Sequence, residues 1–194
     1  MPVSIGASEN TFANPLGLLS DCHRRIERFL QALLTVATKV AGGSLEAEHR
    51  RALEVALKYF HESAPKHTAD EEEDLFPMLR ELRSPCIPAV VAGLDRLEAE
   101  HATAEARHRE VEELCERWLR QNSLPPEHAS RLKNLLMSLS DLYRVHIASE
   151  EERVFPAAKA ELSESELQSI GRRMALRRGV LFMPEPAALS RLES

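Results

Sequence analysis

The sequence HTADEEEDLFP at residues 67–77 returns as HIASEEERVFP at residues 146–156, so the pattern H-x-x-x-E-E-E-x-[L/V]-F-P occurs twice, 79 residues apart. A single histidine precedes each copy on an earlier segment, and these two, His23 and His101, lie 78 residues apart. The matching offsets predict that the chain contains two copies of one helical hairpin, related by a rough two-fold axis.

Each copy places an imidazole and a carboxylate on one face of a helix. His67 and Glu71, four residues apart, lie about 40° apart around a helix axis and about 6 Å apart along it. His146 continues an apolar stripe through Leu139 and Leu142, so its side chain should point into a core. A buried carboxylate without a counter-charge costs several kcal/mol, so the pattern predicts a bound cation.

Apolar residues recur every three or four positions along four long segments, which predicts four amphipathic helices. Pro65 falls inside the second segment, where it should produce a kink because proline lacks a backbone donor. The four helices are expected from Leu16 to Val40, from Ser44 to the stretch 84–88, from Pro88 to about Arg120, and from Pro125 or Pro126 through Val154.

Short loops between four long helices favour an all-α fold, an up-down-up-down four-helix bundle with a short C-terminal fifth helix. Ser163 and Glu166 have the spacing of a capping box at the start of that fifth helix. The predicted organisation is an N-terminal arm at 1–15, the bundle at 16–160, the C-terminal helix at 161–178 and a flexible tail at 179–194.

Composition excludes several functional classes. The net charge of −6 disfavours nucleic acid and anionic membranes as partners. No apolar run reaches the length of a membrane span, and the N-terminus lacks the features of a signal peptide. Three widely spaced cysteines without a C-x-x-C motif suit a reducing compartment. We therefore expect a cytoplasmic protein, either a monomer or a homodimer.

The four histidines and two glutamates suffice for two metal ions. Each ion would receive two imidazoles, and the two carboxylates would bridge the pair. Imidazole and carboxylate without thiolate suit iron or manganese better than structural zinc. A ferritin-like site built on Glu-x-x-His is the alternative, but it does not explain the repeat. The predicted ligands are His23, His67, Glu71, His101, His146 and Glu150.

Three more residues are candidates for additional ligation or for support of the ligands: Glu100, Glu105 and Tyr143. Glu72 and Glu151 are expected on solvated faces, or beside the ligands as supporting groups. Arg172, Arg173, Arg177 and Arg178 form a basic cluster on the fifth helix. This cluster either complements the helix C-terminus or docks an acidic protein partner.

These motifs together resemble the hemerythrin-like proteins, also called HHE cation-binding domains, over residues 16–158. The resemblance implies an up-down bundle around an oxo- or hydroxo-bridged pair of iron ions that handles dioxygen, nitric oxide or redox equivalents. Hemerythrins that carry oxygen have H-x-x-x-H where this chain has His101 and Glu105, and a final aspartate five residues after the last histidine, where Glu150 stands at four. The pattern is more similar to bacterial proteins of nitric-oxide stress and iron–sulfur repair.

The expected function is therefore that of a non-haem di-iron protein that binds or reacts with a small diatomic (dioxygen or nitric oxide) or a peroxide, in sensing, detoxification or iron-centre repair. Manganese or zinc could substitute for iron. The alternatives are an iron-storage or ferroxidase-like enzyme, and a helical interaction module in which metal serves only as a staple. The sequence leaves open whether the protein is an enzyme.

Overall fold

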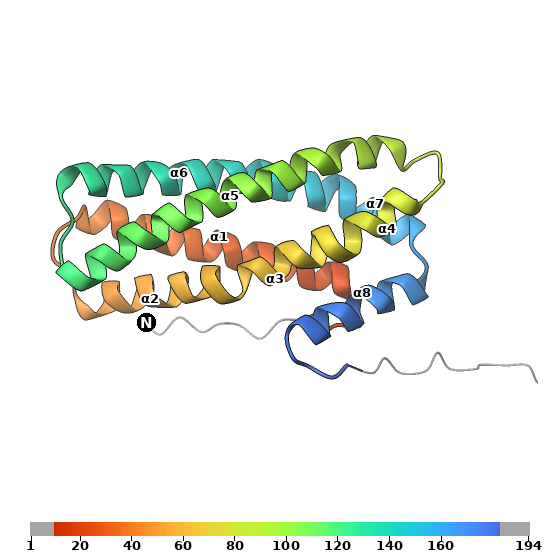
Figure 1. The fold of residues 1–194 in the computed structure, drawn as a ribbon, viewed down its shortest axis with the longest axis horizontal. Coiled ribbons are helices and arrows are strands. Elements are labelled where there is room, and N and C mark those ends of the chain that lie inside the picture. The colour runs from red at the N-terminus through yellow and green to blue at the C-terminus, as the bar shows by residue number, and fades with distance from the viewer. Residues whose placement is uncertain (1–9, 183–194) are drawn as a thin grey trace, which may run out of the picture.

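The computed structural model describes residues 10–182, which form helices and no strand. Four antiparallel rods run up-down-up-down, and a shorter helix packs outside them (Figure 1). The predicted all-α bundle with a fifth helix is thereby confirmed. The first rod is α1 (Pro15–Val40); the second is α2 (Ala47–Glu62), α3 (Ala64–Ala69), η1 (Asp70–Leu75) and α4 (Phe76–Glu81); the third is α5 (Pro88–Gln121); the fourth is α6 (Pro126–Ser149), η2 (Glu150–Val154) and α7 (Phe155–Glu161); the outer helix is α8 (Glu164–Arg177).

Side-chain caps fix the starts of the first and last helices. The Asn14 side chain accepts a hydrogen bond from the Gly17 backbone N–H, which satisfies one donor in the first turn of α1. Ser163 and Glu166 form the predicted capping box at the start of α8. These short polar residues therefore set where α1 and α8 begin.

The second rod is interrupted near Pro65, but not at the proline itself. The break lies at Ser63, between α2 and α3, and Pro65 occupies the first turn of α3. Proline is tolerated there because the backbone N–H of a first-turn residue has no partner within the helix. The predicted kink is thus displaced two residues towards the N-terminus.

Two π-helical turns, η1 and η2, were not predicted from the sequence. In η1 the Phe76 N–H donates to the Glu71 carbonyl, and in η2 the Phe155 N–H donates to the Glu150 carbonyl, in each case five residues back. A proline follows each phenylalanine, and its ring would clash with the carbonyl four residues earlier in a regular α-helix. The wider turn relieves that clash at the residues that carry the two predicted carboxylate ligands.

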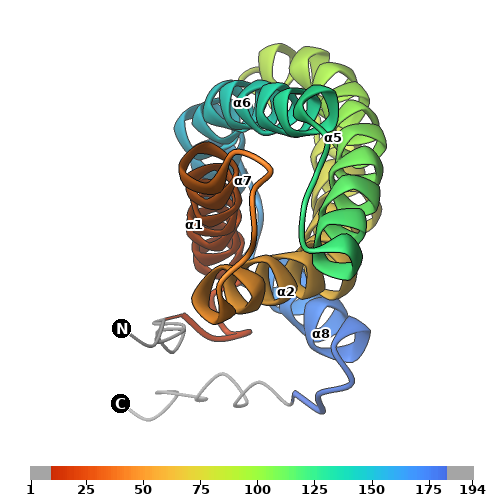
Figure 2. The ribbon, with the colours of Figure 1, turned by 90° about the vertical axis from the view of Figure 1, so that its left-hand side faces the viewer.

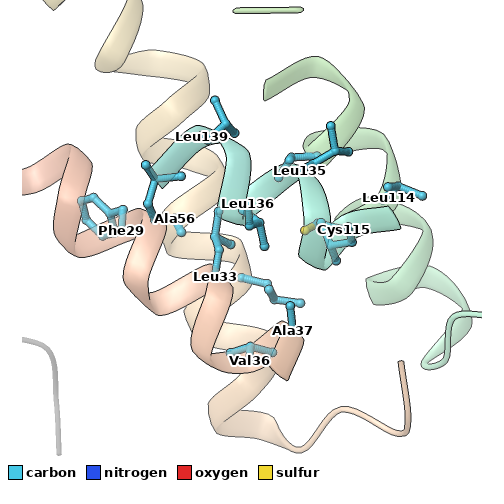
Figure 3. Packing of buried hydrophobic residues seen from close by; sticks show 14 of the residues in the cluster. Phe29, Leu33, Val36, Ala37, Ala56, Leu114, Cys115, Leu135, Leu136 and Leu139 are labelled. Carbon is cyan, nitrogen blue, oxygen red and sulfur yellow. The ribbon is translucent and has the colours of Figure 1, made fainter. Parts of the chain in front are cut away.

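A polar layer divides the interior of the bundle into two apolar clusters. One cluster fills the end near the loop between α1 and α2, where side chains from α1, α2, α5 and α6 interlock (Figure 3). The other lies towards α4, α7 and α8. Along α1, His23 falls between Leu19 of the second cluster and Ile26 of the first. The predicted ligands therefore sit between two well-packed layers.

Helix α8 lies outside the ring of four rods, beside the second rod (Figure 2). Gly171 of α8 permits a close approach to the segment that precedes α1, because a Cβ at this position would lie 1.9 Å from the Phe12 carbonyl oxygen. None of the helices within residues 10–182 combines the length and apolar character needed to cross a membrane. Residues 1–9 of the predicted arm and 183–194 of the predicted tail lie outside the described residues.

Candidate metal centre

All six predicted ligands lie in the polar layer, and all are buried. The histidines come from α1, α3, α5 and α6, and the two glutamates come from the π turns η1 and η2. Glu71 and Glu150 have no exposed surface, and the most exposed of the six, His101, is 8% exposed. The structure thus brings these residues together from all four rods, as the repeat predicts.

Each carboxylate lies close to histidines of both hairpins. Glu71 places Oε1 3.7 Å from Nε2 of His23 and 3.5 Å from Nε2 of His67, and places Oε2 3.4 Å from Nε2 of His101. Glu150 places Oε2 3.1 Å from Nε2 of His23 and Oε1 3.2 Å from Nε2 of His146. We define half-site A by His23 and His67, and half-site B by His101 and His146. The two glutamates bridge the half-sites.

The side-chain atoms that could bind metal lack the hydrogen-bond partners that buried polar atoms normally have. Within residues 10–182, no hydrogen-bond partner is found for Nε2 of His23, His101 or His146, or for any carboxylate oxygen of Glu71 and Glu150. The nitrogen–oxygen pairs are close but lack hydrogen-bond alignment, and the potential ligand atoms gather in two groups, each with its atoms within 4.8 Å of one another. Buried polar groups left in this way are costly, and a cation in each half-site would satisfy them. The residues present therefore fit a pair of metal ions.

Three of the four histidines are held from outside by another carboxylate. Nδ1 of His101 lies 2.8 Å from Glu72, and Nδ1 of His23 lies 3.1 Å from Glu151. Nδ1 of His146 lies 3.0 Å from Glu100. Such partners fix the ring orientation and make the metal-facing nitrogen more basic. Glu100 was among the predicted supporting residues, whereas Glu72 and Glu151 were assigned mainly to solvated faces.

Burial and the bridging carboxylates act in opposite directions on the histidines. Burial lowers the pKa of His23, but interaction with Glu150 and Glu71 outweighs burial and raises this pKa to about 10. The same balance, with Glu71 foremost, raises the pKa of His101 to about 9. At His67 burial prevails and lowers the pKa to about 4. Bound cations would therefore displace protons from the site.

The two bridging carboxylates themselves remain ionised. Burial raises the pKa of Glu71, but His67, His101 and His23 overcome this effect and bring the pKa well below its ordinary value. The pKa of Glu150 is also lowered, by His146 and His23 against burial and the charge of Glu71. Two negative charges thus remain at the centre of the bundle, where they hold protons on His23 and His101 that a bound cation would displace.

The other two candidate residues lie outside this cluster. Glu105 is exposed on α5. Tyr143 is buried, and its hydroxyl forms a hydrogen bond with Nε2 of His108 at 3.1 Å. Both residues line a cavity of about 410 Å³ that also borders His101 and Glu72, beside half-site B. Phe60, which stacks on the His108 ring, gives this cavity an apolar wall.

The basic cluster of α8 binds acidic side chains of η1. Arg178 holds both oxygens of Asp70, with distances of 2.6 and 3.1 Å, and Arg177 donates to Asp70 and Asp74. Asp70 and Asp74 are almost fully buried, and Asp70 immediately precedes the bridging Glu71. The π turn that carries Glu71 is therefore fixed from outside by α8. Docking of a separate acidic protein stays a prediction.

Comparison with known proteins agrees with this geometry. A family model described as the hemerythrin HHE cation-binding domain matches residues 14–161, a range that includes all six converging side chains. A protein of Haemophilus influenzae named only as an uncharacterized protein is 29% identical over 175 residues, which cover 88% of this chain and 93% of that protein.

Proposed function

Because the chain belongs to the hemerythrin HHE cation-binding domain family, we propose that it holds two iron ions in half-sites A and B and uses them to bind or react with dioxygen, nitric oxide or a peroxide. The role of such a centre is sensing, detoxification or the repair of iron centres. Its three cysteines are all free thiols, which is consistent with a reducing, cytoplasmic setting.

The observation that carries the proposal is the pair of buried carboxylates between two pairs of imidazoles. Each glutamate directs one oxygen to each half-site. Oxygen and imidazole donors without thiolate favour iron or manganese, and the centre lies in a bundle interior of the kind that holds di-iron sites. When bound, two iron ions supply two electrons and open coordination positions for a small ligand.

The cavity beside half-site B provides a route for such a ligand. It borders His101 directly, and its lining combines the apolar side chains of Phe60, Ala64 and Pro65 with polar groups that include the hydrogen-bonded pair of His108 and Tyr143. Apolar side chains with a few placed polar groups are the usual lining of a small-molecule site. The Tyr143 hydroxyl is a neutral donor in the lining of this cavity, and burial raises its pKa, so it stays protonated.

The proposal is tested by iron content and by ligand reactivity together. Protein isolated without chelators should contain two iron ions per chain and absorb in the near-ultraviolet. Addition of nitric oxide, dioxygen or hydrogen peroxide to the reduced protein should change that spectrum. Iron content well below two, or a spectrum that none of the three ligands alters, contradicts the proposal.

A matched pair of variants tests the route. Ala102 lines the cavity, whereas Ala99 is exposed on the same helix and does not line it. Ala102→Phe should slow the reaction with the ligand at unchanged iron content, and Ala99→Phe should leave the rate unaltered. Equal rates in both variants and the parent would exclude this cavity as the entrance.

A further inference from the structure

The two half-sites differ in the support of their histidines. The repeat pairs His23 with His101, His67 with His146, and Glu72 with Glu151. Part of the support follows this symmetry, since Glu72 reaches His101 and Glu151 reaches His23, each from the opposite hairpin. The symmetry ends at the remaining two histidines, which lie one in each half-site.

Of these remaining two histidines, His67 and His146, only His146 has a carboxylate beside its Nδ1, the ring nitrogen that faces away from Glu71 and Glu150. Glu100 lies 3.0 Å from Nδ1 of His146, whereas no residue in the described range 10–182 forms a hydrogen bond with Nδ1 of His67. The sequence explains the difference. Glu100 directly precedes His101, and the residue that directly precedes His23 is Cys22. A thiol therefore occupies the position that a carboxylate occupies in the other hairpin.

Cys22 does not replace the missing carboxylate. It is buried, and Nδ1 of His67 has no hydrogen-bond partner within residues 10–182. Its sulfur lies 3.8 Å from the Arg25 guanidinium rather than against His67. Half-site B thus has carboxylates behind both histidines, and half-site A has one behind His23 alone.

We propose that the two bound ions are inequivalent, with the ion in half-site A exchangeable and the ion in half-site B retained. Loss of a carboxylate partner behind a ligating histidine typically costs 10- to 100-fold in metal affinity. The ion in half-site A should therefore dissociate about 10- to 100-fold faster than its neighbour. This inference rests on the proposed function, because it presupposes two bound iron ions.

The test is removal of iron from the full chain by a coloured ferrous chelator under anaerobic conditions. Two phases of one iron each are expected, with rate constants about 10- to 100-fold apart. His67→Gln should leave only the slow phase, and His146→Gln only the fast phase. Circular dichroism of each variant establishes that it is folded.

Glu100→Ala tests the cause of the difference without altering a ligand. It should accelerate the slow phase until the two phases merge, while Glu113→Ala, an exposed carboxylate further along α5, should leave both phases unchanged. A single phase in the parent protein, or a slow phase unaffected by Glu100→Ala, overturns the inference alone. Fewer than two iron ions before chelation would instead overturn the proposed function as well.

Discussion

The two copies of the repeated motif carry the same histidine, glutamates and Phe-Pro pair, yet they differ on the side that faces away from the bridging carboxylates. The first copy has Asp70 and Asp74, and α8 binds both through its arginines. The second copy has Ser149 and Arg153 at the equivalent positions, and in the described part of the chain Ser149 accepts a hydrogen bond from Arg96 of α5 instead. Residues that face the centre are the same in both copies because the site constrains them. Residues that face outward differ, and in the first copy they bind α8.

The largest expected effect tests the part that the copies share. Glu71→Ala and Glu150→Ala should each abolish binding of both ions, because each carboxylate reaches both half-sites. The loss of bound metal should lower the free energy of unfolding by roughly 3 kcal/mol for each ion lost, at metal concentrations a hundredfold above Kd. Iron analysis and denaturant unfolding measure the two effects.

Glu152 lies in the same π turn as Glu150 but is exposed, so Glu152→Ala is the matched control and should retain two ions. A Glu71 variant that keeps one full equivalent of iron would show that this residue serves only one half-site. The two copies would then differ at their centre as well as at their periphery.

The second-largest expected effect tests the outward-facing residues, which differ between the two copies. Asp70→Ala removes the fully buried partner of Arg177 and Arg178, two side chains that retain access to water. The free energy of unfolding should fall by about 2–4 kcal/mol, below the upper range for a fully buried pair because the arginines can be resolvated. Ser149→Ala, the equivalent change in the second copy, should stay within about 0.5 kcal/mol. Equal effects in denaturant unfolding would refute the assigned role of α8.

The smallest effect concerns another difference between the hairpins. His108 corresponds to Leu30 in the first hairpin, 78 residues earlier. Burial lowers the pKa of His108 to about 4, below its ordinary value of 6.5. The unfolded chain therefore binds a proton that the folded chain does not, and stability is lost as pH falls from 6.5 towards 4.

His108→Leu removes this dependence. The stability of the parent relative to the variant should fall by about 1 kcal/mol between pH 6.5 and pH 5.5. Comparison of the two unfolding curves at each pH measures the change, and any constant cost of leaving the Tyr143 hydroxyl without its partner cancels in the slope. A difference that does not vary with pH would contradict a buried, neutral His108.

Much of the fold could be predicted because its signals are local. The four rods follow from apolar periodicity, and the start of α8 follows from the spacing of Ser163 and Glu166. The π turns were missed because a π-helical segment of five or six residues is too short to leave a periodic trace in the sequence. The Phe-Pro pairs that accompany them, at Pro77 and Pro156, were the available signal.

The supporting contacts of the site are harder to predict, since they cross between hairpins. Glu72 and Glu151 look like solvated glutamates in sequence, and only the packing of the rods places each beside a histidine of the other hairpin. The pairing of Arg178 with Asp70 likewise depends on where α8 docks. Four of the six converging side chains were predictable because a repeated H-x-x-x-E restricts where the histidines and glutamates can point, and His23 and His101 were predictable because they repeat with nearly the same offset.

The most direct test of the central claim is an anomalous-scattering map, measured at the iron absorption edge, from crystals of the iron-loaded protein. Two peaks should appear in the polar layer, one against His23 and His67 and one against His101 and His146, with Glu71 and Glu150 touching both. A single peak, or iron bound elsewhere while these six side chains contact no metal, would contradict the account.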